Sequence, residues 1–190
     1  MDKIQLRHQL RSRLVEMTAE QRSEQSRKAC QHLIGIEQFQ RAGVIMIYLA
    51  LPHEVDTTAI ILHAWQKGKT VAVPKVSWQQ RHMIAVAIST LETDFSTSYH
   101  GVRNPTTGLP MPVEDIDLLV APGLAFNENG DRLGRGGAYF DRFFACEQLR
   151  ADKCGLAFSQ QIVESLPMEE HDKKVDLLVT DEGVIYCKGL

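Results

Sequence analysis

The sequence has no Cys-x-x-Cys pair, no apolar run long enough to cross a membrane and no apolar signal core near its first residues. Its four cysteines (Cys30, Cys146, Cys154 and Cys187) are scattered along the chain. This spacing argues against a disulfide framework and a zinc site, and it is typical of reduced thiols. We therefore expect a cytoplasmic protein that does not bind membranes.

The chain also lacks a strong charge bias, since its formal net charge is only −3. Such a balance argues against non-specific binding to nucleic acid, so any basic feature has to be local. The length of 190 residues, with 44% hydrophobic and 24% charged residues, is that of one globular domain. No repeat or linker divides residues 1–190, and we expect a monomer that acts on small molecules.

Segments with helical periodicity alternate with short apolar runs. Thr18 and Gln21 have the spacing of a capping box. We expect helices over residues 2–17, 18–34, 57–66 and 137–149, and strands over 44–49, 70–73, 83–88, 117–121, 153–158, 175–179 and 184–186. Residues 92–113 hold three of the seven prolines, which predicts a long surface connection. The alternation predicts an α/β fold, a three-layer sandwich around a mainly parallel sheet with helices on both faces.

The most informative segment is the glycine loop, which we define as residues 132–141, Arg-Leu-Gly-Arg-Gly-Gly-Ala-Tyr-Phe-Asp. Glycines allow backbone amides to approach an anion closely, and a helix start adds unpaired N–H groups. Arg132 and Arg135 add forked donors that suit phosphate oxygens. The loop matches neither the Walker A motif nor the dinucleotide fingerprint. It is either a polyphosphate site of another kind or a tight turn.

Two further segments follow or precede expected strands, where ligands bind in such sheets: residues 48–57 and 169–176. Lys3, Arg7 and Arg11 form a basic stripe at helical spacing. Each feature also has a purely structural interpretation. The stripe could be a solvated helix face; Glu54, Asp56 and Asp141 could serve only helix starts, and Asp172 could be solvated surface.

Four motifs together resemble those of the 5-formyltetrahydrofolate cyclo-ligase family, also called methenyltetrahydrofolate synthetases. They are the glycine loop, the Lys-x-x-x-Arg of Lys3 to Arg7, Glu-Val-Asp-Thr at 54–57 and Asp-x-Lys-Val-Asp at 172–176. Their order and rough spacing agree with the family over nearly the whole chain.

The resemblance implies an ATP- and Mg²⁺-dependent conversion of 5-formyltetrahydrofolate to 5,10-methenyltetrahydrofolate. It implies that the formyl oxygen is phosphorylated and that N10 then closes the ring with release of phosphate. Arg135 would lie near the transferred phosphate as the catalytic residue, and Asp141 and Asp172 would hold Mg²⁺. Leu51, Glu54 and Asp56 would contact the folate. The residues implied to hold ATP are Lys3, Arg7, Arg132, Leu133, Gly134, Arg135, Gly136, Gly137, Ala138, Tyr139 and Phe140.

The glycine loop departs from the family at two positions, because Ala138 replaces a glycine and Phe140 a tyrosine. Alanine adopts a positive φ only at a cost, so we expect Ala138 to be helical already. Asn104 also replaces a glutamate in the Gly-Val-Arg-Asn-Pro turn of residues 101–105. Two alternative functions remain: a folate- or nucleotide-binding protein without catalysis, and a small-molecule kinase.

Overall fold

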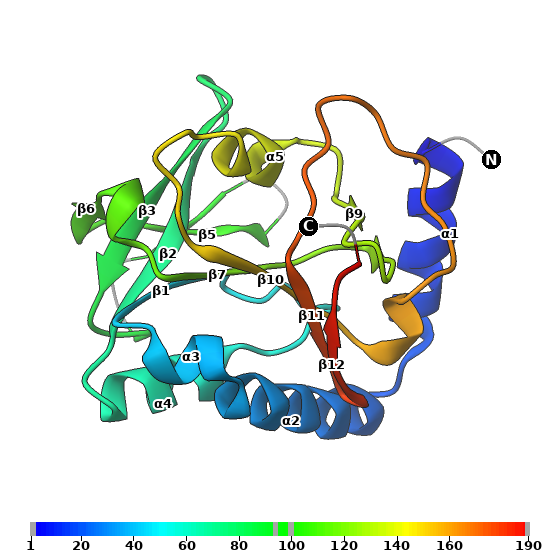
Figure 1. Ribbon diagram of the computed structural model, residues 1–190, viewed down its shortest axis with the longest axis horizontal. Coiled ribbons are helices and arrows are strands. Elements are labelled where there is room, and N and C mark those ends of the chain that lie inside the picture. The colour runs from blue at the N-terminus through cyan, green and yellow to red at the C-terminus, as the bar shows by residue number, and fades with distance from the viewer. Residues whose placement is uncertain (1–2, 93–94, 99–100, 189–190) are drawn as a thin grey trace.

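The computed structural model describes residues 3–92, 95–98 and 101–188, and it is built around one eight-stranded sheet (Figure 1). In spatial order the strands are β12 (Gly183–Tyr186), β11 (Leu177–Thr180), β10 (Asp152–Leu156), β7 (Leu118–Ala121), β1 (Val44–Ile47), β2 (Thr70–Ser77), β3 (His82–Ile88) and β6 (Leu109–Met111). The five central strands from β11 to β2 are parallel, and β12, β3 and β6 pair antiparallel with their neighbours.

The order in which strands are added to the sheet reverses between β1 and β7, which are themselves parallel. From β1 the chain first builds β2, β3 and β6 on one side, and then returns to build β7, β10 and β11 on the other. β1 pairs with both β2 and β7, with Met46 opposite Ala72 and Leu119. Loops after two such strands diverge to opposite sides, which leaves a crevice at their carboxyl ends. The fold therefore places the segments after Ile47 and Ala121 next to each other.

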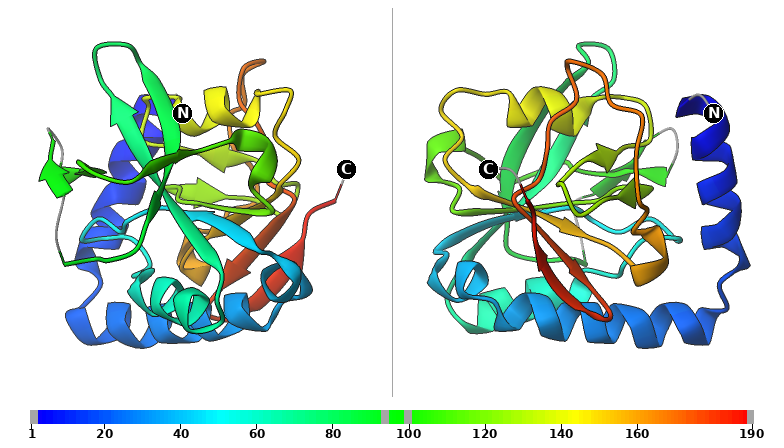
Figure 2. Two further views of the ribbon diagram at one scale, coloured as in Figure 1. Left: turned by 90° about the vertical axis from the view of Figure 1, so that its left-hand side faces the viewer. Right: turned by 45° about the vertical axis from the view of Figure 1, so that its right-hand side comes forward.

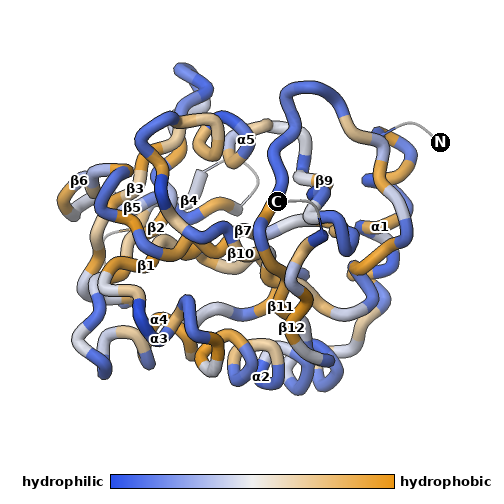
Figure 3. Tube along the Cα trace, in the orientation of Figure 1, coloured by the Kyte–Doolittle hydropathy of each residue, from blue (hydrophilic) through white to orange (hydrophobic). Residues whose placement is uncertain are grey.

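Helices cover both faces of the sheet, as predicted (Figures 1 and 2). They are α1 (Lys3–Glu16), α2 (Ala19–Gly35), α3 (Glu37–Arg41), α4 (Thr58–Gln66) and α5 (Tyr139–Phe144). Ile45 and Ile47 point to the face packed against α2, α3 and α4, whereas Met46 points to the face packed against Phe143 of α5. This alternation is the period-two geometry of a strand buried on both faces. Apolar residues are accordingly concentrated along the sheet in Figure 3.

The first helix stands apart from the layer formed by α2 to α4 and crosses the end of α2 (Figure 2). Only Leu10 and Leu14 of α1 are buried, and both join the core on the α2 side of the sheet. The capping box at the start of α2 is confirmed: Thr18 Oγ1 accepts from Gln21 N, and Gln21 Oε1 accepts from Thr18 N. None of the helices in the described ranges is both long and apolar enough to span a membrane.

The segment at 92–113 was predicted as a surface connection and is more regular than that. It contains β4 (Phe95–Thr97) and β5 (Arg103–Pro105), which pair with each other, and β6, which extends the main sheet; residues 93, 94, 99 and 100 lie outside the described ranges. Asn104 holds this hairpin to the sheet, because its side chain bonds Val76 N and Val76 O, each at 2.9 Å. A second small hairpin, β8 (Ala125–Phe126) and β9 (Arg132–Leu133), was not predicted.

The helix predicted over 137–149 is much shorter, and the prediction that Ala138 is helical was wrong. Ala138 has φ 51° and ψ 26°, the left-handed conformation, and α5 begins only after it. The chain leaves Gly136, itself at φ 106°, and turns sharply into the helix, and this turn imposes positive φ on position 138. Alanine adopts this conformation at a cost of about 1 kcal/mol or more, whereas glycine adopts it freely.

Replacing Ala138 with glycine should stabilise the protein by about 0.5–1 kcal/mol, because glycine relieves the left-handed strain while adding some unfolded-state entropy. Ala145 provides the matched control, since it follows the same helix with φ −77° and is exposed. Ala145→Gly should be neutral or destabilising. Urea denaturation of the two variants measures both effects. Equal destabilisation by the two substitutions would contradict the strain at position 138.

Candidate active site

A cleft of about 1020 Å³ lies at the crevice beyond the carboxyl ends of β1 and β7. Tyr48 and Leu49 reach it from the end of β1, and Pro122 and Gly123 from the end of β7. The glycine loop, the first helix and the segment at 169–172 form further parts of its wall, as do residues between 74 and 83 and the pair Val102 and Arg103. Segments far apart in the sequence therefore meet at the switch point of the sheet, where ligands bind in such folds.

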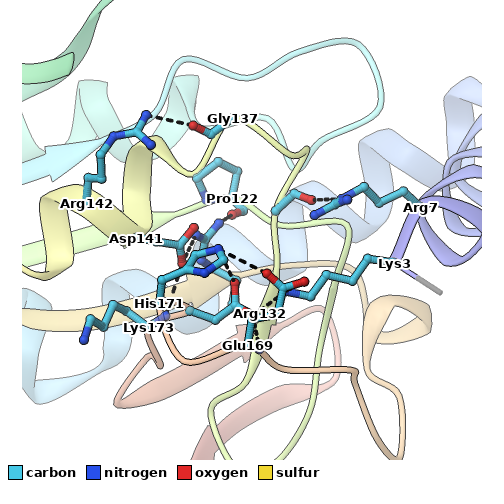
Figure 4. Close-up of polar contacts among 12 residues, drawn as sticks. Lys3, Arg7, Pro122, Arg132, Gly137, Asp141, Arg142, Glu169, His171 and Lys173 are labelled. Carbon is cyan, nitrogen blue, oxygen red and sulfur yellow. Dashed lines mark hydrogen bonds and ion pairs between the residues drawn. The ribbon is translucent and has the colours of Figure 1, made fainter. Parts of the chain in front are cut away.

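Arg132 lies under the glycine loop, with its side chain only 3% exposed (Figure 4). Its Nη2 donates to Asp141 Oδ1 at 2.9 Å, and its Nη1 donates to Pro122 O at 3.2 Å. The guanidinium also lies 5.5 Å from the Phe140 ring centre and 5.6 Å from that of Phe144. This arginine is thus committed to contacts within the protein, and it ties the start of α5 to the end of β7.

The backbone of the glycine loop has its carbonyl groups engaged. Arg7 Nε donates to Gly134 O at 3.0 Å, Arg11 Nη2 to Arg135 O at 3.3 Å, and Arg142 Nη2 to Gly137 O at 2.8 Å. Within the described ranges, the amide groups of residues 134–138 donate to no protein acceptor. Unpaired consecutive amides of this kind are the donors that an anion uses.

The basic stripe of α1 faces the cleft, so the solvated-face interpretation is excluded. Lys3 Nζ donates to Asp172 Oδ2 and lies 3.3 Å from Glu169 Oε1, and Arg7 reaches the glycine loop one turn later (Figure 4). Arg11 reaches the loop a further turn along the helix. Partial burial, together with the charges of Arg135 and Arg7, lowers the pKa of Arg11. Burial is the larger cause of this shift, and the two neighbouring arginines add to it because positive charges gather at this wall.

Glu54 and Arg135 form an ion pair across the cleft. Arg135 Nε and Nη2 lie 3.0 Å and 2.9 Å from Glu54 Oε1, and Leu51 N donates to Glu54 Oε2 at 3.0 Å. The carboxylate is 7% exposed and the arginine 38%. The pair joins the residue predicted to hold folate to the residue predicted to act on phosphate.

All predicted site residues except Asp56 line this one cleft. Asp56 lines a neighbouring cleft instead, and its Oδ1 accepts from Thr58 N at the start of α4, which is the capping role considered for it above. The sequence interpretation missed Pro122 and Gly123, although they directly follow a predicted strand. It also missed Trp78, which reaches the cleft from the β2–β3 turn and packs edge-on against Tyr139, with ring centres 5.3 Å apart.

Comparison with known proteins decides the family. The model of the 5-formyltetrahydrofolate cyclo-ligase family matches residues 1–181. The chain belongs to this family. It is 34% identical to the mouse 5-formyltetrahydrofolate cyclo-ligase over 189 residues, covering 94% of this chain and 93% of that protein. It is 28% identical to the Haemophilus influenzae 5-formyltetrahydrofolate cyclo-ligase, covering 92% and 96% of the two chains.

Solved structures of this family have the same fold as the chain. The NMR structure of the Aquifex aeolicus 5,10-methenyltetrahydrofolate synthetase aligns with a TM-score of 0.86 at 28% identity, covering 100% of this chain and 95% of that one. The Mycoplasma pneumoniae 5,10-methenyltetrahydrofolate synthetase shares the fold with a TM-score of 0.78 at 22% identity, covering 95% and 99%. The chain is therefore an enzyme of this family and has the fold of the family.

Two carboxylates of the cyclo-ligase cleft have the chemistry of a magnesium site. Lys173 N and Arg132 both donate to Asp141 Oδ1, so the contacts described for this carboxylate leave Oδ2 available. Asp172 is likewise bonded through Oδ2, to Lys3 and to Glu169 N. Across the described ranges, no three acidic, histidine or cysteine side chains gather into a metal cage. Two carboxylates suit Mg²⁺, which commonly completes its coordination with water and substrate phosphate.

Asp172 has a pKa below its ordinary value. Desolvation raises the pKa of this carboxyl, but the hydrogen bonds from Lys3 and from the Glu169 amide outweigh it. The side chain of Asp172 is 11% exposed, so its ion pair with Lys3 is partly shielded from water. Since the folded-state pKa is lowered, the charged carboxylate stabilises the fold above the unfolded-state pKa, and this contribution is lost as the pH falls through the folded-state pKa.

Asp172→Asn should lower the free energy of unfolding at pH 7 by about 1 kcal/mol, because Lys3 loses its charged partner. The difference from the wild type should shrink as the pH is lowered from about 5 toward 3, where the native carboxyl gains its proton. Urea denaturation across this pH series measures the effect, and Asp115→Asn, at an exposed carboxylate, is the control. A difference that stays constant down to pH 3 would show that the charge of Asp172 does not contribute.

Proposed function

We propose that this cyclo-ligase uses ATP and Mg²⁺ to convert 5-formyltetrahydrofolate to 5,10-methenyltetrahydrofolate, with ADP and phosphate as the other products. The observation that carries the proposal is the Glu54–Arg135 contact, which brings the glycine loop within reach of a buried carboxylate suited to a folate. A phosphoryl donor and a folate could therefore meet in one cleft.

The wall formed by α1 and the glycine loop suits a triphosphate. Lys3, Arg7 and Arg11 supply positive charge, and the amides of residues 134–138 supply uncommitted donors. Arg135 is the half-exposed arginine of the loop, and it is the one free to move from a carboxylate to the transferred phosphate. Arg132 serves ATP indirectly, since its buried contacts hold Asp141 and the loop in place.

The opposite wall suits a pterin. Glu54 accepts from Leu51 N and Arg135 and can accept from ring N–H groups in place of the arginine. Leu51 lines the cleft beside Glu54 and offers an apolar contact for the ring. Because Glu54 faces the cleft and Asp56 caps α4, Glu54 is the main folate contact of the two.

The chemistry follows from this arrangement. The formyl oxygen attacks the γ-phosphorus, a P–O bond forms, and the bond to the ADP oxygen breaks. N10 then attacks the formyl carbon and loses its proton to solvent, and the C–O bond breaks with release of phosphate. Such transfer depends on positioning and charge neutralisation, which Arg135, Lys3 and Arg7 provide. Mg²⁺ held by Asp141 and Asp172 would neutralise phosphate charge.

We also infer that the protein acts in the cytoplasm as a monomer. Residues of this chain form both walls of the cleft, which supports a site built within one subunit. The net charge of −3 gives no reason to expect binding to nucleic acid or to a membrane surface.

Purified protein mixed with ATP, Mg²⁺ and 5-formyltetrahydrofolate should produce the absorbance of the methenyl product. Omission of any one component, or addition of a metal chelator, should abolish it. Folded, magnesium-supplied protein that binds the folate in calorimetry but gives no product would favour a binding protein. Accumulation of a phosphorylated compound without ring closure would favour a kinase.

Arg135→Ala should lower kcat by roughly 100-fold or more, because the transferred phosphate loses a charged donor. It should also lower stability by about 1–2 kcal/mol, since the buried Glu54 carboxylate loses its partner. Arg142→Ala is the matched control: this arginine also donates to the loop, but it does not line the cleft. Its kcat should stay within about threefold of the wild type. Comparable kcat values for the two variants would show that Arg135 takes no part in the reaction.

A further inference from the structure

The turn that follows β7 contributes to the cleft but has no role in the chemistry described so far. We define this β7 turn as residues 122–124, Pro-Gly-Leu. Pro122 and Gly123 line the cleft, and Gly123 is otherwise buried. A methyl group on Gly123 would come within 2.6 Å of the Phe126 ring, so only glycine allows the backbone to lie this close to the core.

The carbonyl groups of the β7 turn are all bound by side chains from other segments. Arg132 Nη1 donates to Pro122 O at 3.2 Å. Gln161 Nε2 donates to Gly123 O at 2.8 Å and to Leu124 O at 3.3 Å. The peptide groups on both sides of Gly123 therefore have fixed orientations.

Gln161 can hold the turn firmly because both ends of its amide are engaged. It lies in the short 3₁₀ helix η3 (Ser159–Gln161), which follows β10, and it is only 3% exposed. Its Oε1 accepts from Phe158 N at 2.8 Å, while its Nε2 is bonded to the turn. Since β10 is the neighbour of β7, the loop after one strand fixes the loop after the next.

The amide of Gly123 has no acceptor in the part of the chain that the structure describes, whereas Leu124 N donates to Leu133 O at 2.8 Å. The Pro122–Gly123 peptide bond is trans, so this N–H lies opposite the carbonyl group that Arg132 binds. Buried amides without an acceptor are rare in folded proteins, because leaving one unpaired is costly. A ligand in the cleft is therefore the acceptor that this amide lacks.

The Gly123 amide lies beside the candidate magnesium site. One guanidinium, that of Arg132, binds Pro122 O through Nη1 and Asp141 Oδ1 through Nη2. The peptide before Gly123 and the Asp141 carboxylate are thus held side by side. A phosphate that approaches Asp141 comes close to this peptide as well, and an amide oriented in advance stabilises phosphate charge better than a mobile one.

We propose that the Gly123 amide donates a hydrogen bond to a phosphate oxygen of ATP, and that Gln161 is the residue that positions this amide. The inference rests on the proposed function for the identity of the nucleotide. It adds a donor from the β7 turn to the donors of the glycine loop. Gln161 itself touches no substrate and acts only through the peptide groups of the turn.

The amide can be observed directly by NMR. Pro122–Gly123 is the only Pro-Gly pair in the sequence, so proline carrying ¹³C at its carbonyl and glycine carrying ¹⁵N select one amide signal. The non-hydrolysable analogue AMP-PNP with Mg²⁺ should shift this proton downfield, and 5-formyltetrahydrofolate alone should not. Gly68 is the internal control, since its N–H donates to Trp65 O and it lines neither cleft. A Gly123 signal that stays in place at saturating AMP-PNP would overturn the inference.

Gln161→Met tests the positioning role, because it keeps the side-chain length and removes the hydrogen bonds. Calorimetry should show AMP-PNP binding weakened about tenfold, the effect of one hydrogen bond to a charged group. The Kd for 5-formyltetrahydrofolate should change less than about twofold, and the downfield shift of Gly123 should decrease. Gln160→Met, at the exposed neighbouring position, is the matched control and should leave both Kd values unchanged.

A second control separates positioning from stability. Leu33→Ala removes buried core contacts of α2 without touching the β7 turn, and its Kd for AMP-PNP should match that of the wild type. All titrations are made at a temperature where thermal unfolding shows each variant to be folded. Equal weakening of AMP-PNP and folate binding in Gln161→Met would indicate a merely structural role. The NMR titration of the wild type does not depend on any variant.

Failure of the proposed function gives a different result. If the wild type forms no methenyl product but AMP-PNP still shifts the Gly123 amide, the amide binds phosphate in a protein without this activity. If the product forms and the amide does not respond, the proposed function stands and the inference is wrong. A wild type that does not bind AMP-PNP at all would also overturn it.

Discussion

The active-site cleft depends on the buried ion pair between Arg132 and Asp141. Burying two charges costs several kcal/mol per ion, so this pair exists for the geometry that it imposes more than for stability. Through it, the start of α5 is held to Pro122 at the end of β7, and Lys173 joins by donating to the same oxygen of Asp141. The two rings of Phe140 and Phe144 exclude water from the guanidinium. Three separate segments thus acquire one fixed arrangement.

This arrangement determines what the glycine loop can offer a ligand. With both ends of the loop fixed, the positive φ angles of Gly136 and Ala138 turn its backbone sharply. Its carbonyl groups then meet the arginines of α1 and α5, and its amides are left without protein acceptors in the described part of the chain. Arg7 and Arg11, which bind loop carbonyl groups and also line the cleft, therefore serve anion binding indirectly by orienting the peptide groups. The basic face of α1 and the glycine loop therefore contribute to the same candidate anion site.

Local patterns predicted the elements well and their junctions poorly. The apolar run at 44–47 and the capping box at Thr18 depend on neighbouring residues alone, and both predictions are confirmed. Ala138 failed because its conformation is imposed by the turn between Gly136 and α5, against its own preference. Trp78 was missed for a related reason, since its place in the cleft depends on how the β2–β3 hairpin lies over α5. Motifs from four distant segments nevertheless identified the cleft, because parallel strands bring their carboxyl ends together.

The Glu54–Arg135 pair has a consequence for how two substrates share the cleft. In the proposed reaction, a phosphate chain would compete with Glu54 for Arg135, and pterin N–H groups would compete with Arg135 for Glu54. If only the phosphate binds, a carboxylate that is 7% exposed loses its charged partner, which is costly. If both ligands bind, each charge exchanges one partner for another. Under the proposed function, the ion pair would therefore favour joint occupation of the cleft over occupation by ATP alone, and it would in this way protect ATP from reaction with water before the folate is in place.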